Sequence, residues 1–155
     1  MPVEIIECNL SDPLHCQAVS ELTATYMLDD MGSSEVMSAL MKEALIEGLA
    51  KHPAKLLLLA NMDNRFVGLC TCFINFSTFK VKPYLNIHDV IVLNEYRNMK
   101  IGRKLIEKAM DIARQRNYCK LTLEVRNDNQ NAMHLYKSLG FLDSTPPMLF
   151  WTKTL

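Results

Sequence analysis

The sequence predicts a mixed α/β fold in which helices pack on one sheet. Apolar residues recur at helical spacing in some segments and alternate as in strands in others. The order of these segments is strand, two helices, three strands, helix, strand, helix, strand, which is not the order of a doubly wound fold. The length of 155 residues fits one domain, residues 1–155, with one sizeable core.

The first part of the chain predicts a short strand and two helices. Residues 3–8 alternate weakly between apolar and polar side chains. A helix is expected to begin at residues 11–13 (Ser-Asp-Pro), where proline is tolerated in the first turn, and to end at Gly32. We expect the serines at 33 and 34 to cap a second helix, which the His-Pro pair at 52–53 ends.

Three strands are predicted next, at residues 55–61, 65–76 and 84–93. The first is apolar enough to be buried on both faces. The dipeptide Asp63-Asn64 supplies a turn, so the first two strands should form a hairpin.

The last part of the chain predicts helix, strand, helix and strand. Residues 101–116 carry an apolar stripe opposite charged positions, and residues 119–126 alternate cleanly. A short helix at 129–139 should end at Gly140, and residues 148–151 should form a last strand.

Charge and cysteine content limit the classes of function. Seventeen basic residues balance seventeen acidic ones, whereas nucleic-acid binders show a basic excess, so we expect no nucleic-acid partner. The five cysteines are odd in number and scattered, which suits a reducing compartment. No signal peptide or bilayer-spanning segment is recognisable, and we expect a cytoplasmic protein without a membrane partner.

The segment at residues 86–102 indicates a binding site. It reads as a strand, a short loop and the start of a helix, and helix N-termini offer unpaired amides that bind phosphate. Arg97, Lys100 and Arg103 add positive charge, and Gly102 allows a ligand to approach the backbone. The alternative is a plain helix start with solvated basic side chains.

This segment resembles the acetyl-CoA pyrophosphate loop of the GNAT superfamily of N-acetyltransferases, whose pattern is Arg/Gln-x-x-Gly-x-Gly/Ala. Arg97 and Gly102 match the first and last positions, but Lys100 replaces the middle glycine. A positive φ at this lysine would cost roughly 1 kcal/mol. We expect a helical φ instead, which removes the cost and allows the ammonium group to contact phosphate.

A second stretch, residues 121–141, resembles the strand and helix that follow in the same superfamily. The residues that match its pattern are Val125, Asn129, Ala132, Leu135, Tyr136, Gly140 and Phe141. The resemblance implies a mixed, mostly antiparallel sheet flanked by helices. It also implies transfer of an acetyl group from acetyl-CoA to a primary amine by direct attack in a ternary complex. The alternative is a non-catalytic acetyl-CoA-binding sensor or interaction module.

The resemblance also implies which residues bind the cofactor. The backbone around Ile91 and Val92 would pair with the pantetheine arm, the amides from Met99 to Lys104 would hold the pyrophosphate, and Asn129 would hydrogen-bond the cofactor. The complete expected set is Val90, Ile91, Val92, Arg97, Asn98, Met99, Lys100, Ile101, Gly102, Arg103, Lys104 and Asn129. No metal is expected.

Two residues are candidates for the proton transfers. Tyr136 would sit beside the thioester sulfur as general acid, since a phenol with a pKa near roughly 10 is protonated at neutral pH; periodicity alone favours a buried core tyrosine. His88 is the candidate general base, directly or through water, or else a structural histidine. On a regular strand Asp89 would point the opposite way. The amide of Ile91 or Val92 would stabilise the developing oxyanion.

The acceptor amine should lie over the junction of the two N-terminal helices. Tyr26, Asp29 and Asp30 lie there, and Phe76 and Tyr84 could wall the same cleft. Two adjacent carboxylates could attract a cationic amine such as a polyamine or an aminoglycoside, or they could be a solvated helix end. The acceptor is therefore a small-molecule amine or a peptide or protein amine, and the family resemblance allows a homodimer.

Overall fold

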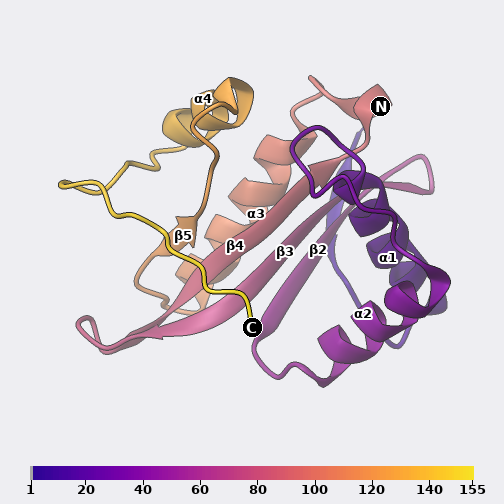
Figure 1. Cartoon of the computed structure of the whole chain (residues 1–155), viewed down its shortest axis with the longest axis horizontal. Coiled ribbons are helices and arrows are strands. Elements are labelled where there is room, and N and C mark those ends of the chain that lie inside the picture. Colours follow the sequence, from indigo (N-terminus) through magenta and orange to yellow (C-terminus); the bar gives the residue numbers. More distant parts are fainter. Residues whose placement is uncertain (1) are drawn as a thin grey trace. The chain divides into compact units, whose positions relative to one another are not determined.

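The N-terminal part of the chain is built around a five-stranded sheet (Figure 1). Residues 2–155 are described in a computed structural model and fall into two units, of which the first ends at Glu124 and the second is Val125–Leu155. The elements of the first unit are β1 (Glu4–Glu7), α1 (Pro13–Met27), α2 (Ala39–Lys51), β2 (Lys55–Met62), β3 (Arg65–Ser77), β4 (Lys82–Val92), the 3-10 helix η1 (Asn94–Tyr96), α3 (Ile101–Gln115) and β5 (Leu121–Leu123). The second unit contains α4 (Gln130–Ser138).

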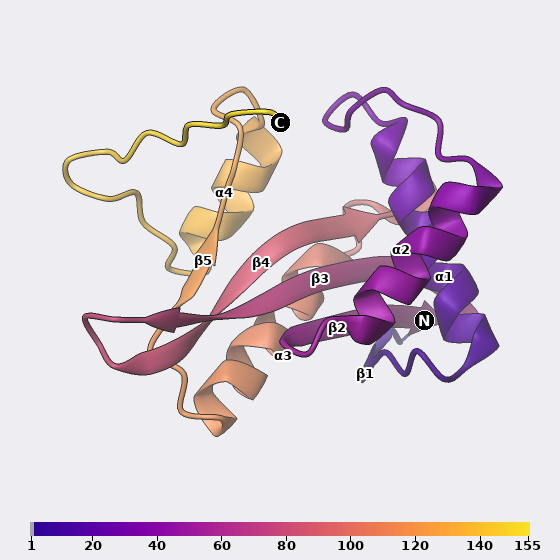
Figure 2. The ribbon, with the colours of Figure 1, turned by 60° about the horizontal axis from the view of Figure 1, so that its bottom comes forward.

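The sheet is mixed and mostly antiparallel, as predicted. Its strand order is β1-β2-β3-β4-β5; the first four strands are antiparallel neighbours, and β5 runs parallel to β4. Helices α1 and α2 cover one face and α3 covers the other (Figures 1 and 2). Leu57, Leu59, Leu69 and Ile91 pack with α1 and α2 and thereby identify that face of the sheet.

The first helix begins where the sequence predicted. Asp12 is its N-cap, and the carboxylate accepts a hydrogen bond from the Leu14 amide at 2.9 Å. The helix ends at Met27, before Gly32 is reached. Its continuation folds back on itself, because the Ser34 amide donates to the Met27 carbonyl at 2.7 Å.

The second helix begins later than predicted. Its N-cap is Ser38, whose hydroxyl accepts from the Met41 amide at 3.2 Å, and not one of the two serines after Gly32. Ser34 has a φ of +61° and belongs to the tight return of the preceding loop, so it cannot start a helix.

The predicted hairpin is confirmed. Asp63 and Asn64 have φ values of +52° and +61°, the left-handed pair that a two-residue hairpin turn requires. Cys70 and Cys72 on β3 face the same side and are fully buried, with their sulfur atoms 3.5 Å apart. Both are free thiols.

Helix α3 packs closely on β3 and β4. The apolar stripe that the sequence predicted is buried along its length. Gly68 makes the close approach possible, since a Cβ at this position would lie 3.2 Å from side-chain atoms of Ile101 and Leu105 and 3.1 Å from the Ile91 carbonyl oxygen. The beginning of α3 is thereby held against the end of β4.

Two predicted strands differ from the structure. The strand predicted at residues 119–126 is shortened to β5, Leu121–Leu123, because only three residues of β4 pair with it. The strand predicted at 148–151 is absent, and residues 139–155 form no helix or strand. A strand needs a neighbour for its peptide groups, and an apolar pattern alone does not supply one.

Candidate active site at the end of strand β4

A β-bulge interrupts β4 at His88. Thr71 pairs with Asp89, whereas Cys72 pairs with Ile87, so His88 is an extra residue without a partner on β3. Such a bulge bends the strand and changes the direction of the side chains beside it.

The bulge brings His88 and Asp89 to the same face of the sheet. Asp89 pairs with Thr71 and therefore faces the same way as Leu69 and Ile91, which belong to the core under α1 and α2. The ring of His88 lies 5.5 Å from the ring of Phe73, which packs against the same core. The expectation that Asp89 points away from His88 was wrong, because it assumed a regular strand.

The environment of Asp89 favours its protonated form. Burial raises the pKa of this carboxyl group, and the neighbouring His88 acts in the opposite direction. A half-buried carboxyl beside an exposed imidazole makes a pair that can accept and hold a proton. The sequence analysis missed Asp89, and only the bulge, which leaves no trace in the alternation of residues, could have identified it.

One edge of β4 is open beyond the bulge. β5 pairs with Leu85, Asn86 and Ile87. Over residues 88–92, strand β4 therefore has β3 on one side and, in the part of the chain that the structure describes, no strand on the other. The expected cofactor residues Val90, Ile91 and Val92 lie here, and such an edge can accept an extended ligand as an added strand.

The turn after β4 has left-handed backbone at two positions. Asn98 has a φ of +63°, and Lys100, the N-cap of α3, has a φ of +62° and a ψ of +18°. The expected helical φ at Lys100 was wrong, so the lysine occupies a conformation that suits glycine and costs other residues about 1–2 kcal/mol. The side chain of Lys100 makes no capping hydrogen bond.

The turn presents main-chain donors. The first bond of α3 runs from the Lys104 amide to the Lys100 carbonyl at 3.0 Å, which leaves the amides of Ile101 and Gly102 without an intrahelical acceptor. A left-handed residue followed by a right-handed one makes successive amides converge on one point. These features, with Arg103 and Lys104 in the first turn, fit a diphosphate.

Arg97 joins this turn to the end of α1. Its guanidinium group binds the Asp29 carboxylate at 2.6 Å, and its Nε lies 3.4 Å from the Val92 carbonyl oxygen. The hydrogen bond from Arg97 holds the pKa of Asp29 below its usual value. A cavity of about 240 Å³ adjoins the pair and is lined by Thr25, Tyr26, Leu28, Asp29, Ile91, Val92, Leu93, Asn94 and Arg97.

The cavity brings together part of the expected acceptor set. Tyr26 and Asp29 line it, and the adjacent Asp30 is exposed. Phe76 pairs with Pro83, whereas Tyr84 pairs with Asn75, so Phe76 and Tyr84 project from opposite faces of the hairpin. The expectation that these two side chains wall one cleft was wrong, because neighbouring positions of a strand alternate in direction.

Two expected site residues belong to the second unit. Asn129 is the N-cap of α4, and its side-chain oxygen accepts from the Ala132 amide at 3.2 Å. Tyr136 lies on the same helix, with its ring 6.1 Å from that of Phe141. Their roles in binding and catalysis stay predictions.

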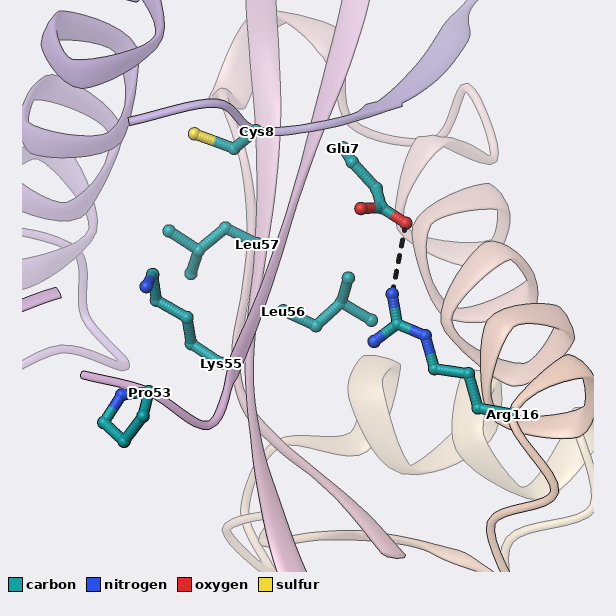
Figure 3. A pocket seen from close by; sticks show the side chains of 7 residues that line it. All are labelled: Glu7, Cys8, Pro53, Lys55, Leu56, Leu57 and Arg116. Carbon is teal, nitrogen blue, oxygen red and sulfur yellow. Dashed lines mark ion pairs between the residues drawn. The ribbon is translucent and has the colours of Figure 1, made fainter. Parts of the chain in front are cut away.

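A second cavity lies near the outer strands β1 and β2. It has a volume of about 140 Å³ and is lined by Glu7, Cys8, Pro53, Lys55, Leu56, Leu57 and Arg116, of which Arg116 pairs with Glu7 (Figure 3). None of the expected site residues lines it. Burial raises the pKa of the Cys8 thiol to about 12, so this thiol stays protonated and unreactive.

Residues 2–155 contain no metal-binding cluster and no bilayer-spanning helix. No group of three or more His, Cys, Asp or Glu side chains is placed to hold a metal ion. No helix among these residues combines the length and apolar character needed to cross a bilayer.

An open strand edge leads into an amide-lined turn, an arrangement that suits an extended, phosphate-bearing ligand. The model of the acetyltransferase (GNAT) family matches residues 18–141. The chain belongs to this family, as the two sequence motifs predicted.

Relatives with known names support the assignment. An uncharacterized N-acetyltransferase of Archaeoglobus fulgidus is 39% identical over 82 residues, which cover 52% of this chain and 56% of that protein. The thialysine N-epsilon-acetyltransferase of Bos taurus is 37% identical over 79 residues, or 51% of this chain and 46% of that protein. The chain thus matches about half the length of these two relatives.

Solved structures show the same fold. The crystal structure of a probable acetyltransferase superposes with a TM-score of 0.84 and 18% sequence identity, over 100% of this chain and 99% of that one.

Proposed function

We propose that this chain is an N-acetyltransferase that transfers an acetyl group from acetyl-CoA to a primary amine by direct attack in a ternary complex. Acetyl-CoA supplies the acetyl group in the activated form of a thioester. The observation that carries the proposal is the open edge of β4, residues 88–92, which runs into the amide-lined turn at the start of α3. Family membership supports it.

The backbone of β4 and of the turn would hold the cofactor. Peptide groups at Val90, Ile91 and Val92 would pair with the pantetheine arm as a neighbouring strand does. The amides that follow Lys100 would bind the diphosphate, with Asn98, Met99 and the basic side chains of the first turn around it. The amide of Ile91 or Val92 would donate to the carbonyl oxygen as negative charge develops there.

His88 and Asp89 would take the proton from the acceptor. Most primary amines are protonated at neutral pH and must lose a proton before they can attack. The bulge places both groups on the face that α1 and α2 cover, the same face as Ile91. We assign the acceptor of the proton to this pair, in which His88 is exposed and Asp89 is half-buried.

Tyr136 would return a proton to the departing thiolate. Asn129, the N-cap of the same helix, would hydrogen-bond the cofactor. The hydroxyl group of a tyrosine is protonated at neutral pH and can donate.

The acceptor would be an amine, and the names of relatives give examples of such acceptors without fixing the one that this chain uses. The name of the Bos taurus relative refers to thialysine. The names of two further relatives, from Bacillus subtilis and Streptomyces lavendulae, refer to an alanine of a ribosomal protein and to streptothricin. A small-molecule amine or a peptide amine is therefore the substrate class. A cytoplasmic location and a homodimer fit the proposal.

A direct assay tests the proposal. Purified protein is incubated with acetyl-CoA and, separately, with spermidine, kanamycin, thialysine and a peptide with an amino-terminal alanine, and acetylated products are identified by mass spectrometry. Calorimetry measures the binding of acetyl-CoA. We expect binding and transfer to at least one amine. Binding without transfer would favour the acetyl-CoA sensor, and no binding would refute both functions.

A further inference from the structure

We propose that Asp29 and Arg97 form a latch that positions the acceptor-binding segment, residues 26–32, against the end of β4. We call this ion pair the Asp29–Arg97 latch. It rests on the proposed acetyltransferase function and adds to it two positioning residues for the acceptor. Arg97 matches a motif position associated with the cofactor, but its contacts point to the acceptor side.

Both oxygens of the Asp29 carboxylate are in use. One accepts from the Arg97 guanidinium group at 2.6 Å, and the other accepts from the Met31 amide at 3.2 Å. A short bond between two charged groups is among the stronger hydrogen bonds in proteins. The carboxylate is therefore fixed in direction by its own loop and by a residue 68 positions away in the chain.

The Arg97 side chain is held between two elements. Its terminal nitrogen reaches Asp29, beyond the end of α1, and its Nε approaches the carbonyl oxygen of Val92, the last residue of β4. The guanidinium group thus bridges the acceptor segment and the strand end where transfer is proposed. Two of its three nitrogens already have protein partners, which leaves less of it for the diphosphate.

The acceptor segment is folded to present Asp29. The Asp29 amide donates to the Tyr26 carbonyl at 3.0 Å, and the Gly32 amide donates to the Asp29 carbonyl at 2.8 Å. A Cβ at Gly32 would collide with the Tyr26 carbonyl oxygen, so the return of the chain requires glycine there. These bonds fix Tyr26 and Asp29 as a unit, which the latch then fixes to the strand.

The latch is more shielded from water than a comparable ion pair on the same turn. The Asp29 side chain is 16% exposed and that of Arg97 is 48% exposed, whereas Arg65 and Glu95 are 56% and 57% exposed. Solvent screens an exposed pair strongly and a partly buried pair less. The latch also closes one wall of the cavity that Tyr26 shares with Ile91.

The latch has a consequence for the charge of the acceptor site. Arg97 neutralises Asp29, so of these two adjacent carboxylates only the exposed Asp30 remains to attract a cation. Two adjacent free carboxylates, as the sequence suggested, are therefore not available. The latch therefore acts by holding the acceptor segment in place. Its loss should weaken binding of the acceptor more than binding of acetyl-CoA.

Kinetics of Asp29→Asn, Arg97→Gln and the double variant test the latch, with the four amines of the panel as probes. We expect each single variant to raise the acceptor KM about tenfold, as a lost charge-assisted bond does, with kcat and the Kd of acetyl-CoA changed less than about twofold. The double variant should be no worse than either single variant, because both remove one interaction. Arg97→Lys should restore part of the affinity.

Glu95→Gln is the matched control, since it breaks the Arg65–Glu95 pair on the same turn and should leave the acceptor KM unchanged. Hydrogen–deuterium exchange of residues 26–34 provides a readout that needs no activity, and exchange should be faster in Asp29→Asn and Arg97→Gln. Unchanged exchange and an unchanged acceptor KM in Asp29→Asn would overturn the latch. A large loss of acetyl-CoA affinity in Arg97→Gln alone would make Arg97 a phosphate ligand instead. A wild-type protein that acetylates none of the amines would count against the proposed function, and the exchange data would still decide the latch.

Discussion

Replacing Lys100 by glycine should stabilise the protein, although the lysine is exposed and its removal deletes a charge near the proposed diphosphate site. Lys100 has a φ of +62°, where its Cβ is crowded by the backbone. That conformation costs a non-glycine residue about 1–2 kcal/mol. Glycine avoids this cost but loses more chain entropy on folding, about 0.5–1 kcal/mol.

The net gain for Lys100→Gly is therefore about 0.5–1 kcal/mol in the free energy of unfolding. For a chain of this length each kcal/mol shifts the melting temperature by roughly 2–4 °C, so Tm should rise by about 1–4 °C. Lys100→Ala is the matched control, because it deletes the ammonium group and keeps the left-handed cost. Lys100→Asn should lie between them, since asparagine tolerates this conformation.

Urea denaturation of the three variants without ligand measures these differences directly. The reasoning fails if glycine and alanine give the same free energy of unfolding, because the backbone term would then be absent. Calorimetry with acetyl-CoA on the same variants separates the contribution of the ammonium group. Weaker binding in both glycine and alanine variants would show that the Lys100 ammonium contacts the cofactor.

Three further predictions concern the proposed proton transfers and the packing of α3. Burial raises the pKa of Asp89, so between the unfolded and folded pKa values the folded chain holds a proton that the unfolded chain releases, and stability falls as pH rises through that range. Asp89→Asn should therefore be more stable than wild type at pH 7 and no more stable near about pH 3, as measured by urea denaturation. The same variant should be less active in initial-rate assays. Tyr136→Phe should lower kcat more than it weakens acetyl-CoA binding, and an unchanged kcat would remove Tyr136 from the mechanism. Gly68→Ala places a Cβ 3.1–3.2 Å from Ile91, Ile101 and Leu105, so it should cost about 1–3 kcal/mol of stability in thermal unfolding; a cost near zero would mean that α3 can shift.

The sequence predicted the elements whose pattern is set by burial. The stripe on α3 became a buried stripe, and the turn at Asp63 and Asn64 joined two strands as expected. In both places the local residue choice and the tertiary contacts demand the same conformation, so local reasoning succeeds.

The features that the sequence did not reveal depend on single peptide units. The bulge at His88 adds one residue to β4 without disturbing the apolar pattern on either side, yet it decides where Asp89 points. The conformation of Lys100 is set by the turn between β4 and α3 and overrides the preference of lysine. The contact between Asp29 and Arg97 joins residues far apart in sequence, and no spacing rule applies to it.

The one-sided strand that makes room for a ligand also has a cost in the absence of that ligand. In the described part of the chain, residues 88–92 have a strand neighbour on one side only, and unpaired strand edges beside apolar side chains such as those of Val90 and Ile91 recruit strands from other molecules. An occupant lying along the border would block such recruitment. With acetyl-CoA as the ligand, as proposed, its supply would then affect how much of this protein stays dispersed as well as the rate of the proposed reaction.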